Sequence, residues 1–120
     1  SIEQQYVGHA KEAAIAARSA HFLFKFVIVV DDDIDPSNMA EVLWAMATRC
    51  DPEVDIDIIR GLHGILLDPV ISPEKRRRDE IDVSSVIINA CKPFHWIKEF
   101  PRTVESSPEL IARVKSKFGL

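Results

Sequence analysis

The run "FVIVVDDDIDPSN", Phe26 to Asn38, constrains the fold more than any other part of the chain. The apolar, β-branched residues 24–30, interrupted only by Lys25, predict a strand that is buried on both faces. Four aspartates follow, at positions 31, 32, 33 and 35, and Pro36 ends the extended segment. Because a strand buried on both faces needs helices to cover it, the run predicts a layered fold.

Two helices are predicted beside this strand. Four alanines before it recur at the spacing of one helical face, so we expect that helix to lie flat on the sheet; they are Ala10, Ala13, Ala14 and Ala17. After the strand, Asn38 is a helix cap, and Glu41 falls at the capping-box distance. An apolar stripe then extends to Asp51-Pro52, where the helix ends. The stripe consists of Met39, Val42, Leu43, Met46, Ala47 and Cys50.

The rest of the chain completes a small mixed sheet. Alternation over residues 55–59 predicts a half-exposed strand, and residues 83–91 predict another. We interpret residues 73–80, "PEKRRRDE", as a charged loop, and Ser107-Pro108 as the start of a last helix. Residues 1–5 are a possible short strand. The predicted fold class is therefore α/β (α+β mixed), with a small mixed β-sheet and flanking helices.

Length and composition limit the possible functions. The 120 residues are 47% hydrophobic, which predicts a single domain, 1–120, with its own core. A net charge of −4 argues against a nucleic-acid partner, and no apolar run is long enough to span a membrane. Two distant cysteines, Cys50 and Cys91, are typical of a cytoplasmic protein. Because the chain begins at Ser1 without Met, we expect the true N-terminus to lie elsewhere.

The acidic run allows two functional hypotheses. In a receiver-like phosphorylation site, the acids at the strand end would hold magnesium, Asp68 would accept phosphate and Lys92 would neutralise charge. However, Asp68 and Lys92 are only 24 residues apart, whereas each βα unit between them needs roughly 30 residues. In the second hypothesis, Asp31, Asp33 and Asp35 hold a metal ion, but solvated acids at a strand end are the simpler interpretation.

No other catalytic motif stands out in the sequence. The four histidines, at positions 9, 21, 63 and 95, lack the spacing of a metal-binding helix. The chain also has no nucleophile elbow, no P-loop and no dinucleotide fingerprint. From the residues alone, the chain has no catalytic constellation.

A longer pattern resembles a known family. The stretch "VVDDDIDPSNMAEVLWAMATRCDPEVDIDII", residues 29–59, resembles the C-terminal domain of the UbiD-type decarboxylases. The family pattern is an apolar strand, an acidic turn, a helix containing V-L/I-W-A, and T-R-x-D-P. The segment Gln5 to Lys11 is similar to the family's entry into this domain, with Val7 where proline is usual. The strings "LLDP", "SSVIINACKPF" and "SPELIARVKSKFGL" are similar to later parts of the domain.

The resemblance implies roles for two groups of residues. The first is a structural motif that ends the strand and positions the next helix, in which Arg49 pairs with one of the carboxylates. Its members are Asp32, Asp33, Asp35, Trp44 and Arg49. The second group, Ile65, Leu66 and Leu67, matches an apolar wall of the substrate pocket, although ordinary core packing explains these residues equally well.

The resemblance also implies what the whole protein does. The family removes carbon dioxide, reversibly, from aromatic or unsaturated carboxylic acids with prenylated FMN, a divalent metal and potassium. Its N-terminal domain holds these groups, so we assign no catalytic, cofactor or metal residue to this chain and expect it to be inactive alone. Expected partners are that N-terminal domain, further copies of the chain and a small aromatic acid. The alternative is a stand-alone receiver-like or regulatory interaction module.

Overall fold

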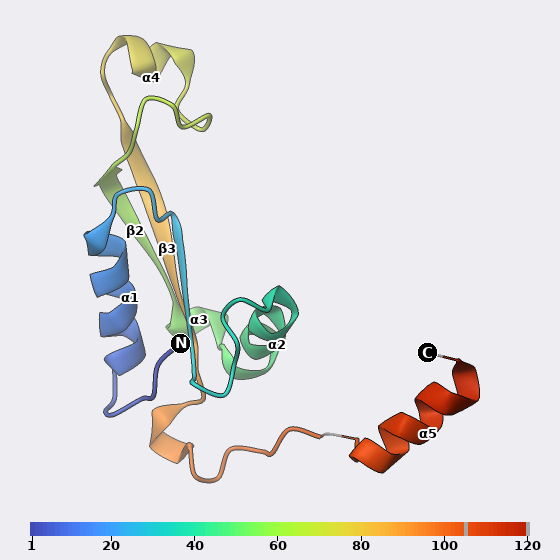
Figure 1. Ribbon diagram of the computed structural model, residues 1–120. Coiled ribbons are helices and arrows are strands. Elements are labelled where there is room, and N and C mark those ends of the chain that lie inside the picture. Colours follow the sequence, from blue (N-terminus) through green and yellow to red (C-terminus); the bar gives the residue numbers. More distant parts are fainter. Residues whose placement is uncertain (105, 120) are drawn as a thin grey trace.

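A three-stranded mixed sheet forms the centre of the protein, as predicted. A computed structural model describes residues 1–104 and 106–119 (Figure 1). In the sheet order β1-β3-β2, strand β1 (Phe26–Val30) runs parallel to β3 (Asp82–Ala90), and β2 (Ile56–His63) runs antiparallel to it. Because β1 and β3 are parallel, their carboxyl ends, Val30 and Ala90, lie at the same edge of the sheet.

Strand β1 is less buried than the sequence predicted. Val29 and Val30 are buried, but Phe26 is 72% exposed. The prediction of a strand covered on both faces is therefore wrong at its start, although Val27 and Ile28 are partly buried against the helix-covered clusters. Val29 packs on one face of the sheet and Val30 on the other, as alternation requires.

The two predicted helices cover opposite faces of the sheet. Helix α1 (His9–Ala20) packs through Ala10 and Ala14 against Val29 and Ile87, which confirms the helix lying flat on the sheet. Its small side chains allow this close approach. Ala17 of the predicted face is exposed, however, and Arg18 is the buried residue of the last turn. Helix α2 (Met39–Arg49) packs on the other face.

The ends of α2 are as predicted, but its buried face is different. Asn38 caps the helix by accepting a hydrogen bond from Ala40 N at 3.2 Å. Val42 and Ala45 are buried, with Met46 partly so, whereas Met39 and Leu43 of the predicted stripe are more than half exposed. The three-stranded sheet is too narrow to cover the whole stripe.

Three short helices connect the main elements. Helix α3 (Pro52–Asp55) follows α2, and the 3-10 helix η1 (Phe94–Trp96) follows β3. The predicted charged loop contains helix α4 (Pro73–Arg77), so that prediction is wrong. The sequence did contain its signal, because Ser72 caps the helix and Pro73 occupies its first position. Residues 1–5 form no strand beyond a single bridge between Ile2 and Asp31.

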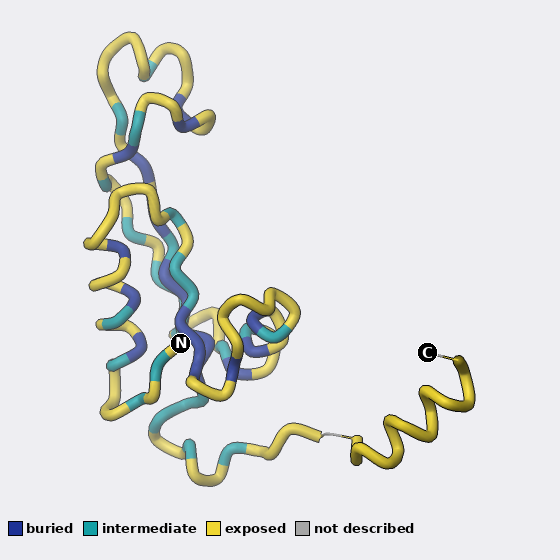
Figure 2. Tube along the Cα trace, in the orientation of Figure 1, coloured by how far each residue is buried: buried dark blue, intermediate teal, exposed yellow. Residues whose placement is uncertain are grey.

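The last helix, α5 (Pro108–Phe118), begins as predicted. Ser107 caps it, and Gly119 ends it in the left-handed conformation. Every described residue of this helix is exposed, and it lies apart from the sheet (Figures 1 and 2). The radius of gyration is 19.1 Å, whereas a compact domain of this length has about 14 Å. The chain is therefore more extended than a compact domain of its length.

Candidate functional site

Asp31 lies at the centre of a buried polar cluster where β1 and β3 end. Its side chain is only 5% exposed. Oδ2 accepts hydrogen bonds from Arg49 Nη1 at 2.8 Å and from the backbone nitrogen of Lys92 at 2.7 Å. Oδ1 accepts one from Gln4 Nε2 at 2.8 Å, and the same nitrogen donates to the Lys92 carbonyl at 2.9 Å. One carboxylate thus joins helix α2 to the N-terminal segment before α1 and to the segment that follows β3.

Asp33 provides the ion pair that was expected for Arg49. The two guanidinium nitrogens donate to its two oxygens at 2.7 and 3.0 Å, and Lys92 Nζ donates at 2.6 Å. The hydrogen bond from Arg49 lowers the pKa of Asp33 from 3.8 to about 2, and Lys92 adds to this effect while partial burial opposes it. Asp33 therefore stays ionised at any physiological pH.

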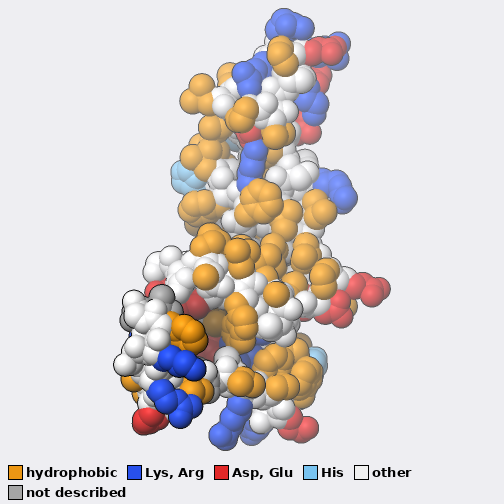
Figure 3. Space-filling view, turned by 90° about the vertical axis from the view of Figure 1, so that its right-hand side faces the viewer, with side chains coloured by type: hydrophobic (Ala, Val, Ile, Leu, Met, Phe, Trp, Pro, Cys, Tyr) orange, Lys and Arg blue, Asp and Glu red, His pale blue; other side chains and the backbone are white. Residues whose placement is uncertain are grey.

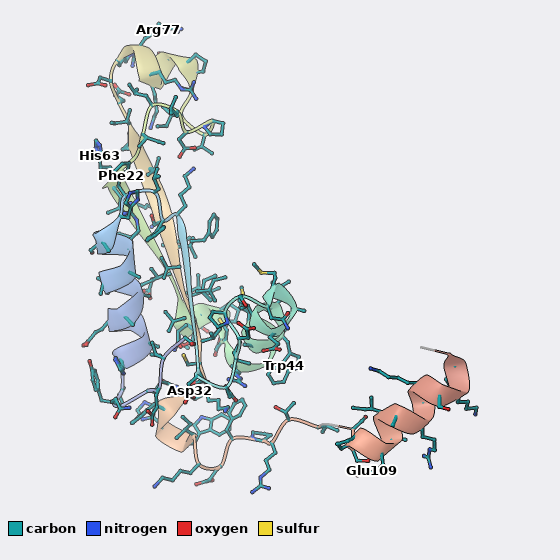
Figure 4. The ribbon with its side chains drawn as sticks, viewed as in Figure 1. Phe22, Asp32, Trp44, His63, Arg77 and Glu109 are labelled. Carbon is teal, nitrogen blue, oxygen red and sulfur yellow. The ribbon has the colours of Figure 1, made fainter. Side chains whose placement is uncertain are left out.

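The other members of the predicted structural motif lie around this cluster. Asp32 is exposed at the end of β1, and Trp44 projects from α2 (Figure 4). The Trp44 ring lies 5.2 Å from the Arg49 guanidinium carbon. Asp35 Oδ1 accepts hydrogen bonds from Ser37 N and Oγ, at 2.8 and 2.7 Å, and these bonds lower the pKa of Asp35. The contacts of Asp33, Asp35, Trp44 and Arg49 support a structural role for these residues, which stays a prediction. Among the described residues, the Asp32 side chain has no hydrogen bond or ion pair that would support the same role.

This arrangement contradicts the two hypotheses drawn from the acidic run. Arg49 fills the position between Asp31 and Asp33 that a metal ion would need. Among the described residues, no three His, Cys, Asp or Glu side chains are grouped as metal ligands. The receiver-like site is wrong because Asp68 pairs with Lys25 before β1, whereas Lys92 pairs with Asp33 beyond the other end of that strand.

A cavity of about 580 Å³ lies beside the polar cluster. Its lining includes Arg49, Cys91, Trp96 and Lys11. The two cations are already neutralised, Arg49 by the aspartates of the cluster and Lys11 by Asp57 at 2.8 Å. This donor set does not fit the phosphate of a flavin. Burial raises the pKa of the Cys91 thiol to about 12, which makes it a poor nucleophile at neutral pH.

The predicted pocket wall lies near the other end of the sheet, in the loop between β2 and α4. Ile65 is half-buried, Leu66 is 48% exposed and Leu67 is 85% exposed. Core packing within this chain therefore does not account for the two leucines. Beside them, Asp68 is buried and forms an ion pair with Lys25, whose hydrogen bond lowers the pKa of the Asp68 carboxyl.

Comparison with known proteins identifies the family. Residues 1–90 match the family described as the 3-octaprenyl-4-hydroxybenzoate carboxy-lyase C-terminal domain. The chain belongs to the UbiD family. Over 106 residues it is 35% identical to an anhydromevalonate phosphate decarboxylase of Methanothermobacter thermautotrophicus. The match covers 88% of this chain and 24% of the relative, so the UbiD-type chain described here spans about a quarter of that protein's length.

Solved UbiD-class structures have the same fold. HmfF from Pelotomaculum thermopropionicum, in complex with FMN, is 32% identical, with a TM-score of 0.76 over 92% of this chain and 23% of its own. The apo 3,4-dihydroxybenzoic acid decarboxylase of Klebsiella pneumoniae is 28% identical, with a TM-score of 0.73 over 94% of this chain and 25% of its own. The family and the mixed fold predicted from the sequence are therefore confirmed.

Two features of this UbiD domain were missed in the sequence. Asp31 was assigned to the rejected metal site and not to the structural motif, although it is the residue that joins the chain segments. Its position directly after a buried strand was the available signal. The pairing of Asp68 with Lys25 had no such signal, because 43 residues separate the two in the chain.

Proposed function

We propose that this chain is the pocket-closing and oligomer-forming domain of a UbiD-type decarboxylase. An N-terminal domain of the same protein carries prenylated FMN, a divalent metal and potassium. When bound, the flavin supplies the electron sink that the release of carbon dioxide requires. The full protein, and not this domain alone, is the enzyme, and its free cysteines are consistent with a cytoplasmic location.

The observation that carries this proposal is the amount of apolar surface left uncovered. Figure 3 shows many hydrophobic side chains over the middle of one face of the molecule, with charged side chains mainly around the margin of this face. Large apolar residues at least 43% exposed occur around the start of β1 and on the loop after β2; they are Phe22, Leu23, Phe24, Phe26, Leu66, Leu67 and Val70. An exposed apolar surface of this kind marks an interaction site, which is what the domain of a larger enzyme needs.

We propose that Leu66 and Leu67 form part of a substrate pocket. A cavity of about 260 Å³ between their loop and the segment 22–25 supports this proposal for Leu67, which lines the cavity, whereas Leu66 does not. An apolar wall removes water from a carboxylate substrate and selects acids by shape.

The described part of the chain contains no helix that is long and apolar enough to cross a bilayer.

Helix α5 supports the oligomer part of the proposal. Its apolar side chains share one face at helical spacing; they are Leu110, Ile111, Val114 and Phe118, each at least 38% exposed. We propose that this face packs on another copy of the protein. Removing residues 107–120 then lowers the native mass measured by light scattering, whereas Lys115→Ala, on the same helix, leaves it unchanged. An unaltered mass after the deletion would reject this role.

The proposed substrate is a small aromatic or unsaturated carboxylic acid. Two solved relatives act on 3,4-dihydroxybenzoic and vanillic acids, which favours the aromatic class. A second candidate, anhydromevalonate phosphate, is favoured by two curated relatives that are 35% and 42% identical to this chain.

One experiment separates these possibilities. The full-length protein, loaded with prenylated FMN, is offered 3,4-dihydroxybenzoate, vanillate and anhydromevalonate phosphate, and the released carbon dioxide is measured. Leu67→Ala lowers kcat/KM for the acid that is turned over by about 10-fold, because one wall of the pocket recedes. Val104→Ala, at a 98% exposed position in the segment before α5, is the matched control.

The possible negative results have different meanings. If the protein releases carbon dioxide and Leu67→Ala does not change the rate, Leu67 is not part of the pocket wall. The proposal that the full protein is a decarboxylase would still stand. A native protein of only 13.5 kDa without flavin absorbance would favour a stand-alone regulatory module instead.

A further inference from the structure

The loop that carries Leu66 and Leu67 is anchored at its base while its tip is exposed. Its first and last residues, Gly64 and Ile71, are buried, although Leu67 at its tip is 85% exposed. Gly64 N donates a hydrogen bond to Ile81 O at 2.8 Å, which holds the loop at its start. An apolar loop tip that faces outward keeps a fixed position only if other contacts hold it.

Asp68 supplies several of these contacts. Its backbone nitrogen donates to Ile65 O at 3.0 Å, and its Oδ1 accepts from Val70 N at 3.1 Å. Its carbonyl accepts hydrogen bonds from Ile71 N at 3.1 Å and from Arg76 Nη2 at 2.7 Å. The side chain is 8% exposed, so its charge requires a partner.

Lys25 is that partner, and its backbone is held by hydrogen bonds to the sheet. Its Nζ pairs with Asp68 Oδ2, and its carbonyl accepts a hydrogen bond from Val86 N of the central strand at 2.7 Å. The preceding residue is held as well, because Ser85 Oγ donates to Phe24 O at 3.3 Å and accepts from buried Arg18 Nε at 2.6 Å. The ion pair therefore connects the loop directly to the sheet.

We propose that Lys25 and Asp68 are positioning residues that hold Leu66 and Leu67 at the substrate pocket. This inference rests on the proposed pocket-closing function. The Asp68 carboxylate binds Lys25 with one oxygen and the backbone nitrogen of Val70 with the other. These two directional contacts fix the orientation of the loop, whereas an apolar contact would not. A displacement of the pocket wall by about 1 Å can lower the rate of catalysis up to about 100-fold. Loss of a contact that positions the wall is therefore expected to lower activity.

The test uses the full-length, flavin-loaded protein and two measurements. The first is hydrogen–deuterium exchange of the amides in loop 64–71. The second is the ratio of the dissociation constants of benzoate and 2-naphthoate, measured by calorimetry. This ratio reports the shape of the pocket, and the fraction of correctly folded protein cancels from it.

The variants separate the ion pair from general stability. Lys25→Met and Asp68→Asn both remove the pair, and Asp68→Asn also keeps the size of the side chain. Lys25→Arg keeps the charge. Lys75→Met removes an exposed pair with Asp82, at 3.1 Å, close to the same loop and is the matched control. Leu67→Ala tests the pocket wall by itself.

We expect the two pair-breaking variants to speed loop exchange at least about tenfold. They also shift the ratio of dissociation constants at least about fivefold, in the direction that Leu67→Ala shifts it. Lys25→Arg and Lys75→Met stay within about twofold of the parent in both measurements.

Three results would overturn a part of the argument, and they are distinguishable. If loop exchange is unchanged in both pair-breaking variants, the ion pair does not position the loop. The inference also fails if exchange speeds up and Leu67→Ala shifts the ratio while the pair-breaking variants do not. If Leu67→Ala itself leaves the ratio unchanged, the proposed pocket wall fails, whatever the ion pair does.

Discussion

Arg49→Met tests the polar cluster at the end of β1. The guanidinium is 1% exposed and donates to Asp31 at 2.8 Å and to Asp33 at 2.7 and 3.0 Å. Methionine has a similar volume and keeps the apolar part of the side chain, but it is shorter than arginine, so the substitution removes the charge and the contacts with the two aspartates. It leaves the carboxylate of Asp31, 5% exposed, without its cationic partner.

The expected loss of stability follows from two opposing effects. Breaking a buried ion pair costs about 3–5 kcal/mol, and the two hydrogen bonds that Asp31 retains, from Gln4 and Lys92, favour the lower end of this range. The Arg49 Nε is buried and has no hydrogen-bond partner among the described residues, so its removal returns about 1 kcal/mol. The net destabilisation is therefore about 2–4 kcal/mol.

Hydrogen–deuterium exchange of the full-length protein measures this effect. Amides of β1 and α2 exchange roughly 30- to 1000-fold faster in Arg49→Met, because each 1.36 kcal/mol is a factor of ten. Arg77→Met, on the exposed surface of α4 (Figure 4), is the control and leaves these amides unchanged. The double variant Arg49→Met/Asp31→Asn recovers part of the loss. Parent-like protection in Arg49→Met would refute the view that this pair holds β1 and α2 together.

Three further predictions concern other parts of the domain. Between pH 4 and 2, protonation of Asp33 destabilises the folded state by about 1 kcal/mol. The pKa of Asp33 falls from 3.8 to about 2 on folding, so the unfolded chain binds the proton first, and the 43% exposure of its side chain limits the effect. In acid unfolding curves Asp33→Asn removes this contribution, whereas those of Asp35 and Asp68, whose pKa values are also lowered, remain. Gly64→Ala destabilises the domain by about 1–3 kcal/mol in urea unfolding, because the added Cβ would lie 2.7 Å from Ile81 O. Unfolding at the parent urea concentration would show instead that the loop moves to accept the methyl group. Asn38→Ala removes the cap of α2 and costs about 1 kcal/mol, seen as about fivefold faster exchange in the first turn of that helix, whereas Ser37→Ala leaves those amides at the parent rate.

The sequence alone determined the elements whose signals are local. Alanine spacing predicted α1, Asn38 and Ser107 predicted two helix starts, and the four-aspartate run predicted the end of β1. Long strings of residues also indicated the family. These features depend on neighbours in the chain, so a single sequence is enough to show them.

Only the tertiary structure decided which apolar residues are covered and which charges meet. Phe26, Met39 and Leu43 belong to apolar runs, yet they stay exposed because the sheet has only three strands. Asp68 was a candidate phosphate acceptor and instead pairs with Lys25, which lies far away in the sequence. Burial and long-range ion pairs depend on how the elements pack, and no local pattern records that packing.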